Sequence, residues 1–453
     1  MISHPWRQGL HLEPPQGWLN DPNGLAYFQH RYHVFFQFCP QSAGGVGAKC
    51  WGHYESPDLV HWTYTGAPLQ PGGVYDLGDA YSGSAVAQGD TLWLYYTGNY
   101  KAPGPHDYIH TGRHHNTIRV AFDGRQCQGR KQLLLSNLDY PRHCTLHVRD
   151  PKVWQEGQMW WMVLGARDQA DRGEVLLYRS PDGEKWSLER ELKKADFGYM
   201  WECPDCFRLD GQWLLSVSPQ GLPHGETCCQ NVYQSGYFPL SAAPLEGELG
   251  AFAEWDMGFD FYAPQSFAAP DGRRLLVGWM GMPDAPYHNP TVPLGWQHCL
   301  TMPRELSWKE GRVYQRPARE MEGLCRLWRA LPETVEVKTP VRVQARAKGP
   351  ARLTLAEGLH LEYDPDQRLF TMTFSDSALG GGRTVRRARL EGETLELDLW
   401  VDNSSVECYL NGGHTVFSTR FYPIHTPIRL EGQGLEGHYA PLRTLQVEEM
   451  QES

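Results

Sequence analysis

The chain has 453 residues and a formal net charge of −11 at pH 7, with 41% hydrophobic and 21% charged residues. Its 47 glycines, 33 prolines and 17 tryptophans are typical of a turn-rich, β-rich globular protein and exclude a disordered, collagen-like or coiled-coil chain. The acidic charge argues against nucleic acid as a partner, and no apolar run reaches the roughly 18 residues of a membrane helix. We therefore expect neither a nucleic-acid nor a membrane partner; the oligomeric state stays open.

A short turn followed by an aromatic or β-branched run recurs along the first two thirds of the chain. The runs begin near residues 31, 90, 157, 211 and 272, at steps of about 60 residues. This period is longer than the roughly 40–45 residues of a WD40 blade and fits a four-stranded sheet with long loops. We predict an all-β fold in which residues 1–310 form a five-bladed β-propeller. A β-sandwich with chance turn spacing is the alternative.

The pattern breaks at residues 311–335, which we expect to form a linker with a short helix within 319–328. Alternating apolar and polar residues then return, for example in Leu395–Val401, and tight-turn residues such as Asn411–Gly413 separate the runs. Residues 336–453 are therefore predicted to form a C-terminal antiparallel β-sandwich.

Cysteine use and the first residues bear on the compartment. The chain has eleven cysteines, an odd number, which argues against a disulfide framework. Its first eight residues contain no apolar segment of a secretory signal. Both observations predict a cytoplasmic protein.

A segment rich in polar residues precedes each of these aromatic or β-branched runs. Strand propensity alone does not explain its composition. If the blades are in register, these segments are the innermost strands and meet at one axis; they are residues 18–24, 81–84, 149–152, 201–205 and 261–265. Such a pocket would hold Asp21, Asp150 and Glu202 together. Crowding of like charges raises carboxyl pKa values, which is how a carboxylic acid stays protonated near neutral pH.

Three of these segments resemble the acidic signatures of the glycoside hydrolase family 32 β-fructosidases, which include invertases and sucrose-6-phosphate hydrolases. They are Trp18–Gly24, Arg149–Pro151 and Trp201–Asp205, in the family's order. Further blocks match at residues 51–53, 58–62, 81–85 and 402–407. The resemblance implies a five-bladed propeller followed by a β-sandwich, in agreement with the period above.

The resemblance also implies roles for the three acids. Asp21 would be the nucleophile, Glu202 the general acid/base and Asp150 the stabiliser of the transition state. A retaining glycosidase needs two carboxyl groups about 5–5.5 Å apart, one to attack the anomeric carbon and one to protonate the leaving oxygen. No cofactor and no metal are implied.

The remaining residues implied to bind the sugar are amides, a hydroxyl, an arginine and aromatic faces. They are Trp18, Leu19, Asn20, Gln37, Trp51, Tyr81, Ser82, Arg149 and Trp279. Cys39 and Tyr54 depart from the family's usual residues, outside the three acidic signatures.

Two other features have competing interpretations. Cys203 and Cys206 have the spacing of a redox or zinc motif, but no second pair completes a zinc set. Histidines and arginines crowd residues 106–147; this segment is either a solvated surface or a basic rim that pairs with the phosphate of sucrose 6-phosphate.

The function that we expect is that of a retaining β-fructofuranosidase acting on sucrose, sucrose 6-phosphate or both. A short-chain fructan hydrolase, a fructosyltransferase and a catalytically silent sugar-binding protein are the alternatives. The partners would be small sugars, including short fructo-oligosaccharides.

Overall fold

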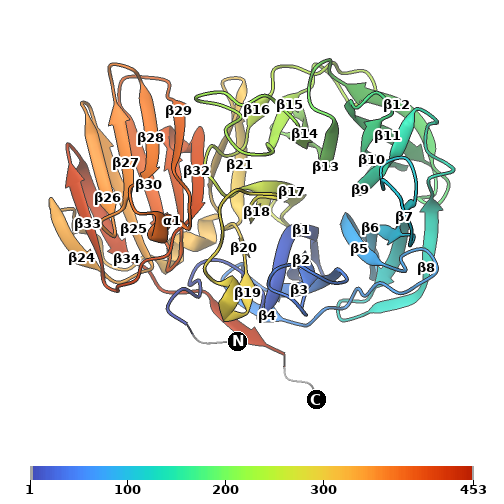
Figure 1. The fold of residues 1–453 in the computed structure, drawn as a ribbon, viewed down its shortest axis with the longest axis horizontal. Coiled ribbons are helices and arrows are strands. Elements are labelled where there is room, and N and C mark those ends of the chain that lie inside the picture. The colour runs from blue at the N-terminus through green and yellow to red at the C-terminus, as the bar shows by residue number, and fades with distance from the viewer. Residues whose placement is uncertain (1–3, 451–453) are drawn as a thin grey trace.

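The computed structural model describes residues 4–450. Five sheets surround a central axis, and two further sheets stand beside them (Figure 1). The innermost strands of the five are β1 (Gly17–Phe28), β5 (Asp79–Gln88), β9 (Cys144–Glu156), β13 (Met200–Leu209) and β17 (Tyr262–Ala268). The predictions of an all-β fold and of these innermost segments are confirmed. None of the helices within the described residues is long and apolar enough to cross a membrane.

The main four strands of each of the five sheets come from one stretch of the chain, and in the first sheet β19 (Trp296–Gln297) is added in parallel beside β1. The first contains β1, β2 (Arg31–Cys39), β3 (Cys50–Ser56) and β4 (His61–Tyr64). The second continues from β5 with β6 (Thr91–Lys101), β7 (Arg113–Phe122) and β8 (Cys127–Leu135). The third continues from β9 with β10 (Met159–Asp168), β11 (Gly173–Ser180) and β12 (Ser187–Lys193). The fourth continues from β13 with β14 (Gln212–Gln220), β15 (Gly236–Pro239) and β16 (Ala253–Glu254).

The fifth sheet is β17, β18 (Arg274–Met280), β21 (Arg304–Lys309) and β22 (Arg312–Pro317), with β20 (Cys299–Leu300) against β18. It therefore extends past residue 310, into the segment expected to be a linker. The 3₁₀ helix η2 (Arg319–Leu324) follows, and a second one, η1 (Val292–Leu294), precedes the short strand β19 (Trp296–Gln297).

The strands are apolar on both faces because each sheet is covered by the next one around the axis. In β6, Leu94 packs into the core shared with the first sheet, whereas the adjacent Tyr95 packs into the core shared with the third. Successive strand residues point to opposite faces, so one strand supplies two cores. The core that contains Phe36 and Val277 joins the fifth sheet to the first and closes the ring.

The two remaining sheets lie face to face and share a second large core. One sheet has the order β23 (Arg329–Ala330), β34 (Glu436–Pro441), β25 (Val341–Ala347), β30 (Leu395–Val401), β31 (Ser405–Leu410) and β32 (Thr415–Arg420). The other has the order β24 (Thr334–Val337), β33 (Ile428–Gln433), β26 (Ala351–Leu355), β27 (Leu359–Asp364), β28 (Leu369–Phe374) and β29 (Val385–Arg389), and α1 (Ser377–Gly380) lies in the β28–β29 connection.

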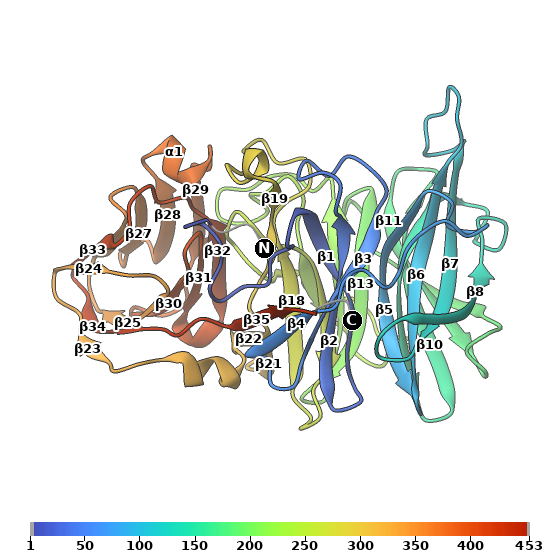
Figure 2. The same ribbon diagram turned by 90° about the horizontal axis from the view of Figure 1, so that it is seen from below.

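The C-terminal strand leaves this pair of sheets. β35 (Gln446–Glu449) runs back along the ring and pairs in parallel with β4 (Figure 2). The range predicted as a sandwich, 336–453, thus includes a strand of the first sheet. At the start of the chain, Gly9 and Leu10 donate to the Asp402 carboxylate at 2.7 and 2.6 Å. Both ends of the chain therefore tie the two halves together.

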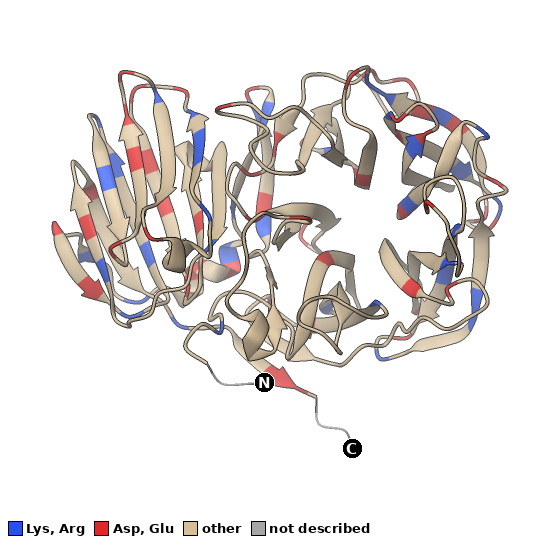
Figure 3. Ribbon diagram, in the orientation of Figure 1, with Lys and Arg blue, Asp and Glu red and all other residues tan. Residues whose placement is uncertain are grey.

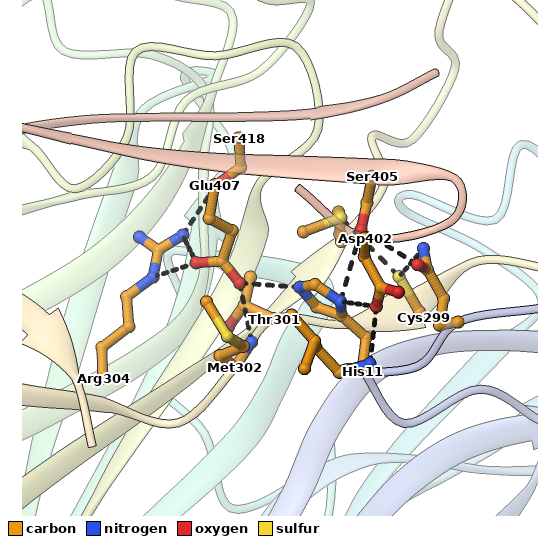
Figure 4. A network of polar contacts seen from close by, with 12 residues as sticks. His11, Cys299, Thr301, Met302, Arg304, Asp402, Ser405, Glu407 and Ser418 are labelled. Atoms are coloured by element: carbon orange, nitrogen blue, oxygen red, sulfur yellow. Dashed lines mark hydrogen bonds and ion pairs between the residues drawn. The ribbon is translucent and has the colours of Figure 1, made fainter. Parts of the chain in front are cut away.

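A buried polar network fills the junction between the ring and the two packed sheets (Figure 4). The His11 ring lies between Asp402, at 2.7 Å from Nδ1, and Glu407, at 3.0 Å from Nε2. Both ring nitrogens face carboxylate oxygens, so both carry protons, and these bonds raise the pKa of His11 to about 9 against the opposing effect of burial. The Arg304 guanidinium joins Glu407, at 2.8 Å, to Asp256, at 2.9 Å.

Candidate active site

Each of the five innermost strands has a register shift at the same level of the ring. In the first, second, fourth and fifth sheets the shift spans Leu19–Pro22, Tyr81–Gly83, Glu202–Asp205 and Tyr262–Gln265. In the third, β9 is shifted between Arg149 and Lys152 against β10. A β-bulge re-aims one side chain out of the alternating pattern. The five bulges thus turn side chains from five separate strands toward one space. Acidic positions lie on β1 and β13 close to the central axis (Figure 3).

Backbone conformation shows where the bulges are tightest. Asp150, Cys203 and Ala263 have φ values of 63°, 45° and 48°, in the left-handed region that residues other than glycine seldom adopt. Asp150 N donates to Thr97 Oγ1 at 2.9 Å, which holds this turn of the chain in place. Unfavourable backbone geometry of this kind is concentrated at functional sites.

The bulges open into a cavity of about 380 Å³. Its lining is mostly polar and consists of Trp18, Asn20, Asp21, Gln37, Gly44, Gly45, Lys49, Tyr81, Ser82, Arg113, Arg149, Asp150, Glu202, Gln220, Tyr262, Trp279, Pro283 and Asp284. The three acids singled out in the sequence are therefore together in one pocket, although they come from three sheets.

Asp21 is half-buried and held by two side chains. Ser82 Oγ donates to its Oδ2 at 2.5 Å, and Asn20 Nδ2 donates to its Oδ1 at 3.1 Å. Gln37 Oε1 lies 3.1 Å from the same Asn20 amide nitrogen and fixes its orientation. Burial raises the pKa of Asp21, the nearby Glu202 carboxylate adds to this, and the bonds from Ser82 and Asn20 oppose it.

Asp150 is the most enclosed of the three acids, at 4% exposure. Its Oδ2 accepts from the backbone N–H of Cys203 at 3.0 Å and lies 3.9 Å from the Arg149 guanidinium. Burial raises the pKa of Asp150 to about 7, and the charges of Glu202 and Asp21 add to the effect while Arg149 opposes it.

Glu202 lies in a ring of donors. Arg149 donates from its NH2 group to Oε1 at 2.6 Å, and Gln220 Nε2 and the Tyr262 hydroxyl donate to Oε2 at 2.8 and 2.7 Å. Three polar side chains thus fix the carboxyl plane, while the group keeps 17% of its surface exposed toward the pocket. Such a group is both oriented and reachable by a ligand.

Seven of the nine residues predicted to bind substrate line the pocket: Trp18, Asn20, Gln37, Tyr81, Ser82, Arg149 and Trp279. Leu19 and Trp51 do not, and this expectation needs correction. Both are completely buried in the cores beside the first sheet, Leu19 because it points to the opposite side of β1 from Trp18 and Asn20. The Trp51 indole donates to the Tyr81 carbonyl at 3.0 Å and thereby fixes β5 rather than a ligand.

Several lining residues were not predicted as sugar-binding. Tyr262 lies in the fifth innermost segment, so its position on the repeat was the signal that would have found it. Gln220 is at the far end of β14, and Gly44, Gly45 and Lys49 belong to the β2–β3 connection, where no periodic pattern marks them. Of the basic residues within 106–147, Arg113 is the one that lines the pocket.

The two cysteines of the Cys203–Cys206 pair have separate surroundings. Cys203 Sγ lies 3.5 Å from Asp21 Oδ2 and 3.6 Å from Asp150 Oδ2, whereas Cys206 is buried in the core between the third and fourth sheets. Burial raises the pKa of both thiols well above its ordinary value. The two sulfurs thus lie in different environments, Cys203 beside two carboxylates of the pocket and Cys206 in an apolar core, and burial disfavours the thiolate form of both.

One cluster within residues 4–450 has ligand types suited to a metal ion: His143, Cys144 and Glu174. It lies outside the pocket lining. His143 Nε2 and Glu174 Oε1 already form a 2.7 Å hydrogen bond there, and Lys193 lies 3.8 Å from the other oxygen.

Comparison with known proteins places the chain in a family. Residues 11–317 match the model of the glycosyl hydrolases family 32 N-terminal domain, and residues 330–440 match that of the family 32 C-terminal domain. The chain is 38% identical to a sucrose-6-phosphate hydrolase of Escherichia coli, with 91% of this chain and 89% of that protein covered. It is 39% identical to a raffinose invertase of Escherichia coli, with coverages of 92% and 90%.

Solved structures agree. The sucrose-6-phosphate hydrolase of Lactobacillus gasseri superposes with a TM-score of 0.90 at 28% identity, covering 98% of this chain and 94% of that one. The family 32 β-fructofuranosidase of Bombyx mori gives a TM-score of 0.84 at 28% identity, with coverages of 98% and 96%. The chain belongs to glycosyl hydrolase family 32.

Proposed function

We propose that the protein is a retaining β-fructofuranosidase that hydrolyses the fructosyl bond of sucrose and sucrose 6-phosphate. The observation that carries this proposal is the meeting of Asp21, Asp150 and Glu202 in one polar pocket, with Glu202 oriented by Arg149, Gln220 and Tyr262. The relatives named as sucrose-6-phosphate hydrolase and invertase support the substrate class.

In the first half-reaction, a carboxylate oxygen of Asp21 attacks C2 of the fructosyl unit and forms an ester, while the bond from C2 to the bridging oxygen breaks. Glu202 donates its proton to that oxygen, so that the glucosyl product leaves as an alcohol. The bonds from Ser82 and Asn20 favour the ionised form of Asp21 that the attack needs.

In the second half-reaction, the Glu202 carboxylate takes a proton from water, and the resulting hydroxide attacks C2. The ester bond to Asp21 breaks, fructose leaves, and both carboxyl groups return to their starting states. Asp150 accepts hydrogen bonds from fructose hydroxyls, and these bonds strengthen as positive charge develops at C2. The reaction needs no reagent beyond these groups and water.

The test measures kcat/KM for sucrose and sucrose 6-phosphate with the unmodified protein and with Asp21→Asn. We expect cleavage of both sugars, release of the fructose in its β-anomeric form, and loss of activity in the variant. Full activity of Asp21→Asn would remove the nucleophile assignment, and inactivity of the unmodified protein toward both sugars and short fructans would favour a silent sugar-binding protein.

A fructosyltransferase performs the same first half-reaction and differs in the acceptor that reaches the ester. Product analysis at high sucrose concentration separates the two, because accumulating trisaccharides reveal transfer.

We also propose that the five sheets form one five-bladed β-propeller domain and that the two sheets packed face to face form a second domain, with the connection beginning after β22, at residue 318. All eleven cysteines are free thiols, and six of them are buried, which supports a reducing compartment such as the cytoplasm.

A further inference from the structure

We propose that Arg113 binds the phosphate group of sucrose 6-phosphate and makes the pocket selective for the phosphorylated sugar. This inference rests on the proposed function and adds the residue that recognises the phosphate. Arg113 is the first residue of β7, and it lines the same pocket as Glu202 and Arg149.

The position of Arg113 relative to the reacting groups follows from a chain of contacts. Arg149 donates from NH2 to Glu202 at 2.6 Å and from NH1 to His147 Nδ1 at 2.6 Å. Arg113 NH1 lies 3.3 Å from the other nitrogen of the same ring, Nε2. The His147 ring thus lies between Arg113 and Arg149, the arginine that orients Glu202. Glu202 protonates the leaving glucosyl oxygen, so Arg113 lies on the side of the pocket that receives the glucosyl group.

The His147 ring gives Arg113 no acceptor. Because Nδ1 accepts from Arg149, this nitrogen has no proton, and the neutral ring carries its proton on Nε2. Nε2 lies 3.0 Å from the Tyr108 carbonyl oxygen and donates to it. Arg113 NH1 therefore faces an N–H group rather than a lone pair. Burial and the charges of Arg149 and Arg113 lower the pKa of His147 to about 2, which keeps the ring neutral.

The rest of the Arg113 guanidinium lacks a partner as well. Its Nε is buried and has no hydrogen-bond acceptor among residues 4–450, and no carboxylate of that range forms an ion pair with it. A buried N–H donor without an acceptor is costly, and the planar fork of N–H groups of a guanidinium suits two oxygens of a phosphate. The unmet donors thus point to an anionic ligand group.

Two other cations of the basic segment are paired with carboxylates, Arg119 with Glu184 at 2.6 Å and Lys131 with Asp76. Burial and neighbouring arginines lower the pKa of His115 well below its ordinary value, so this ring is neutral. Arg149 is engaged by Glu202. Lys49 is the other cation on the pocket wall, and its ammonium donates to the backbone oxygens of Gly45 and Gly47. Among the three cations on the pocket wall, Arg113 is therefore the one whose guanidinium has a buried donor without an acceptor among residues 4–450.

The experiment compares kcat/KM for sucrose 6-phosphate and for sucrose in Arg113→Gln, Arg113→Lys and a control, Arg142→Gln. Arg142 is an exposed residue of the same basic segment that does not line the pocket. We expect Arg113→Gln to lower kcat/KM for sucrose 6-phosphate about ten- to hundredfold, the scale of a lost charged hydrogen bond, with less than about a threefold change for sucrose. Arg113→Lys should restore part of the preference, and Arg142→Gln should change neither value.

A second readout does not depend on turnover. Titration calorimetry with glucose 6-phosphate and with glucose should show tighter binding of the phosphate to the unmodified protein, and this difference should vanish in Arg113→Gln. Thermal melting of each variant checks that it is folded.

Equal losses on both sugars in Arg113→Gln would overturn the proposal and make Arg113 a positioning residue for Arg149. An unchanged preference would overturn it too. If the unmodified protein cleaves sucrose without preferring the phosphate, the phosphate site fails while the fructosidase function stands. If it cleaves neither sugar but binds glucose 6-phosphate through Arg113, the phosphate site stands while the fructosidase function fails.

Discussion

The molecule has two buried clusters of carboxylates, arginine and histidine, and they differ in how completely their charges are paired. At the junction, His11 is bonded on both ring nitrogens and Arg304 bridges two carboxylates. In the pocket, burial and mutual repulsion raise the pKa of Asp21 and Asp150, and the Arg113 guanidinium keeps free donors.

The two histidines show the difference most directly. His11 lies between two carboxylates, and its pKa is raised to about 9; His147 lies between two arginines, and its pKa is lowered to about 2. The same side chain is thus a fixed cation in one cluster and a neutral spacer in the other. A cluster with matched charges stabilises the fold, whereas a cluster with unmatched charges has capacity left for a ligand or a proton.

Removing a charge from the pocket should abolish activity without loss of stability. We expect Asp21→Asn to lower kcat at least about 10⁴-fold, the scale for losing one member of a catalytic set. Its melting temperature should be unchanged or higher, because the variant no longer buries a carboxylate. Asp364→Asn, at a turn of the C-terminal sheets, is the control for activity. A marked fall in the melting temperature of Asp21→Asn would mean that the charges in the pocket are also paired in a way that stabilises the fold.

Removing a charge from the junction should have the opposite effect. Glu407 contacts His11, Arg304, the Tyr409 hydroxyl and the backbone of Met302, all buried. Glu407→Gln removes one of the two carboxylate partners of both His11 and Arg304, and we expect a loss of about 3–5 kcal/mol in the free energy of unfolding.

The matched control is Glu396→Gln, which breaks an exposed 3.1 Å pair with Arg346 and should cost at most about 1 kcal/mol. Chemical denaturation measures both. The kcat of folded Glu407→Gln should equal that of the unmodified protein. A loss of kcat without a loss of stability would contradict the view that the junction cluster serves stability and the pocket cluster serves activity.

Removing one donor to Glu202 should have an intermediate effect on activity. Tyr262→Phe deletes the 2.7 Å bond to Oε2 and leaves those from Arg149 and Gln220. We expect kcat/KM for sucrose to fall about tenfold or somewhat more, as for one hydrogen bond to a charged group. Tyr314→Phe removes a 3.2 Å bond to Glu310 away from the pocket and should leave kinetics unchanged. Equal effects of both variants would argue against a role for Tyr262 in orienting Glu202.

The smallest effect concerns the pH dependence of stability. The raised pKa of His11 means that its contribution is complete below about pH 6.5 and is lost as pH rises through about 9. Glu407 has its pKa lowered to about 2, so its contribution is complete above about pH 4.5 and is lost only in strong acid.

Melting temperatures measured from pH 6.5 to 9.5 should therefore decline, and the decline should be weaker in His11→Gln than in the control His61→Gln, which changes an exposed pair with Asp58. The same slope in both variants would show that His11 is not protonated in the folded protein.

Much of the fold was predictable because its signals are local and repeated. A turn and an apolar run at steps of about 60 residues marked the second strand of each sheet, and the bulged segments before them marked the axis. The predicted boundaries were less accurate. β22 extends the fifth sheet to Pro317, and β35 returns to the first sheet, because strand pairing between distant segments leaves no periodic trace.

The residues of the site were likewise predictable from the sequence only in part. The sequence by itself determined the all-β class, the order of the strands and the acids that share the axis, because motif and period are properties of neighbouring residues. Only the tertiary structure decided that Leu19 and Trp51 pack in cores, that Tyr262 and Gln220 hold Glu202, and that Arg113 faces the pocket unpaired. The direction of a side chain at a bulge and the partner it finds there depend on chain segments that are distant in sequence.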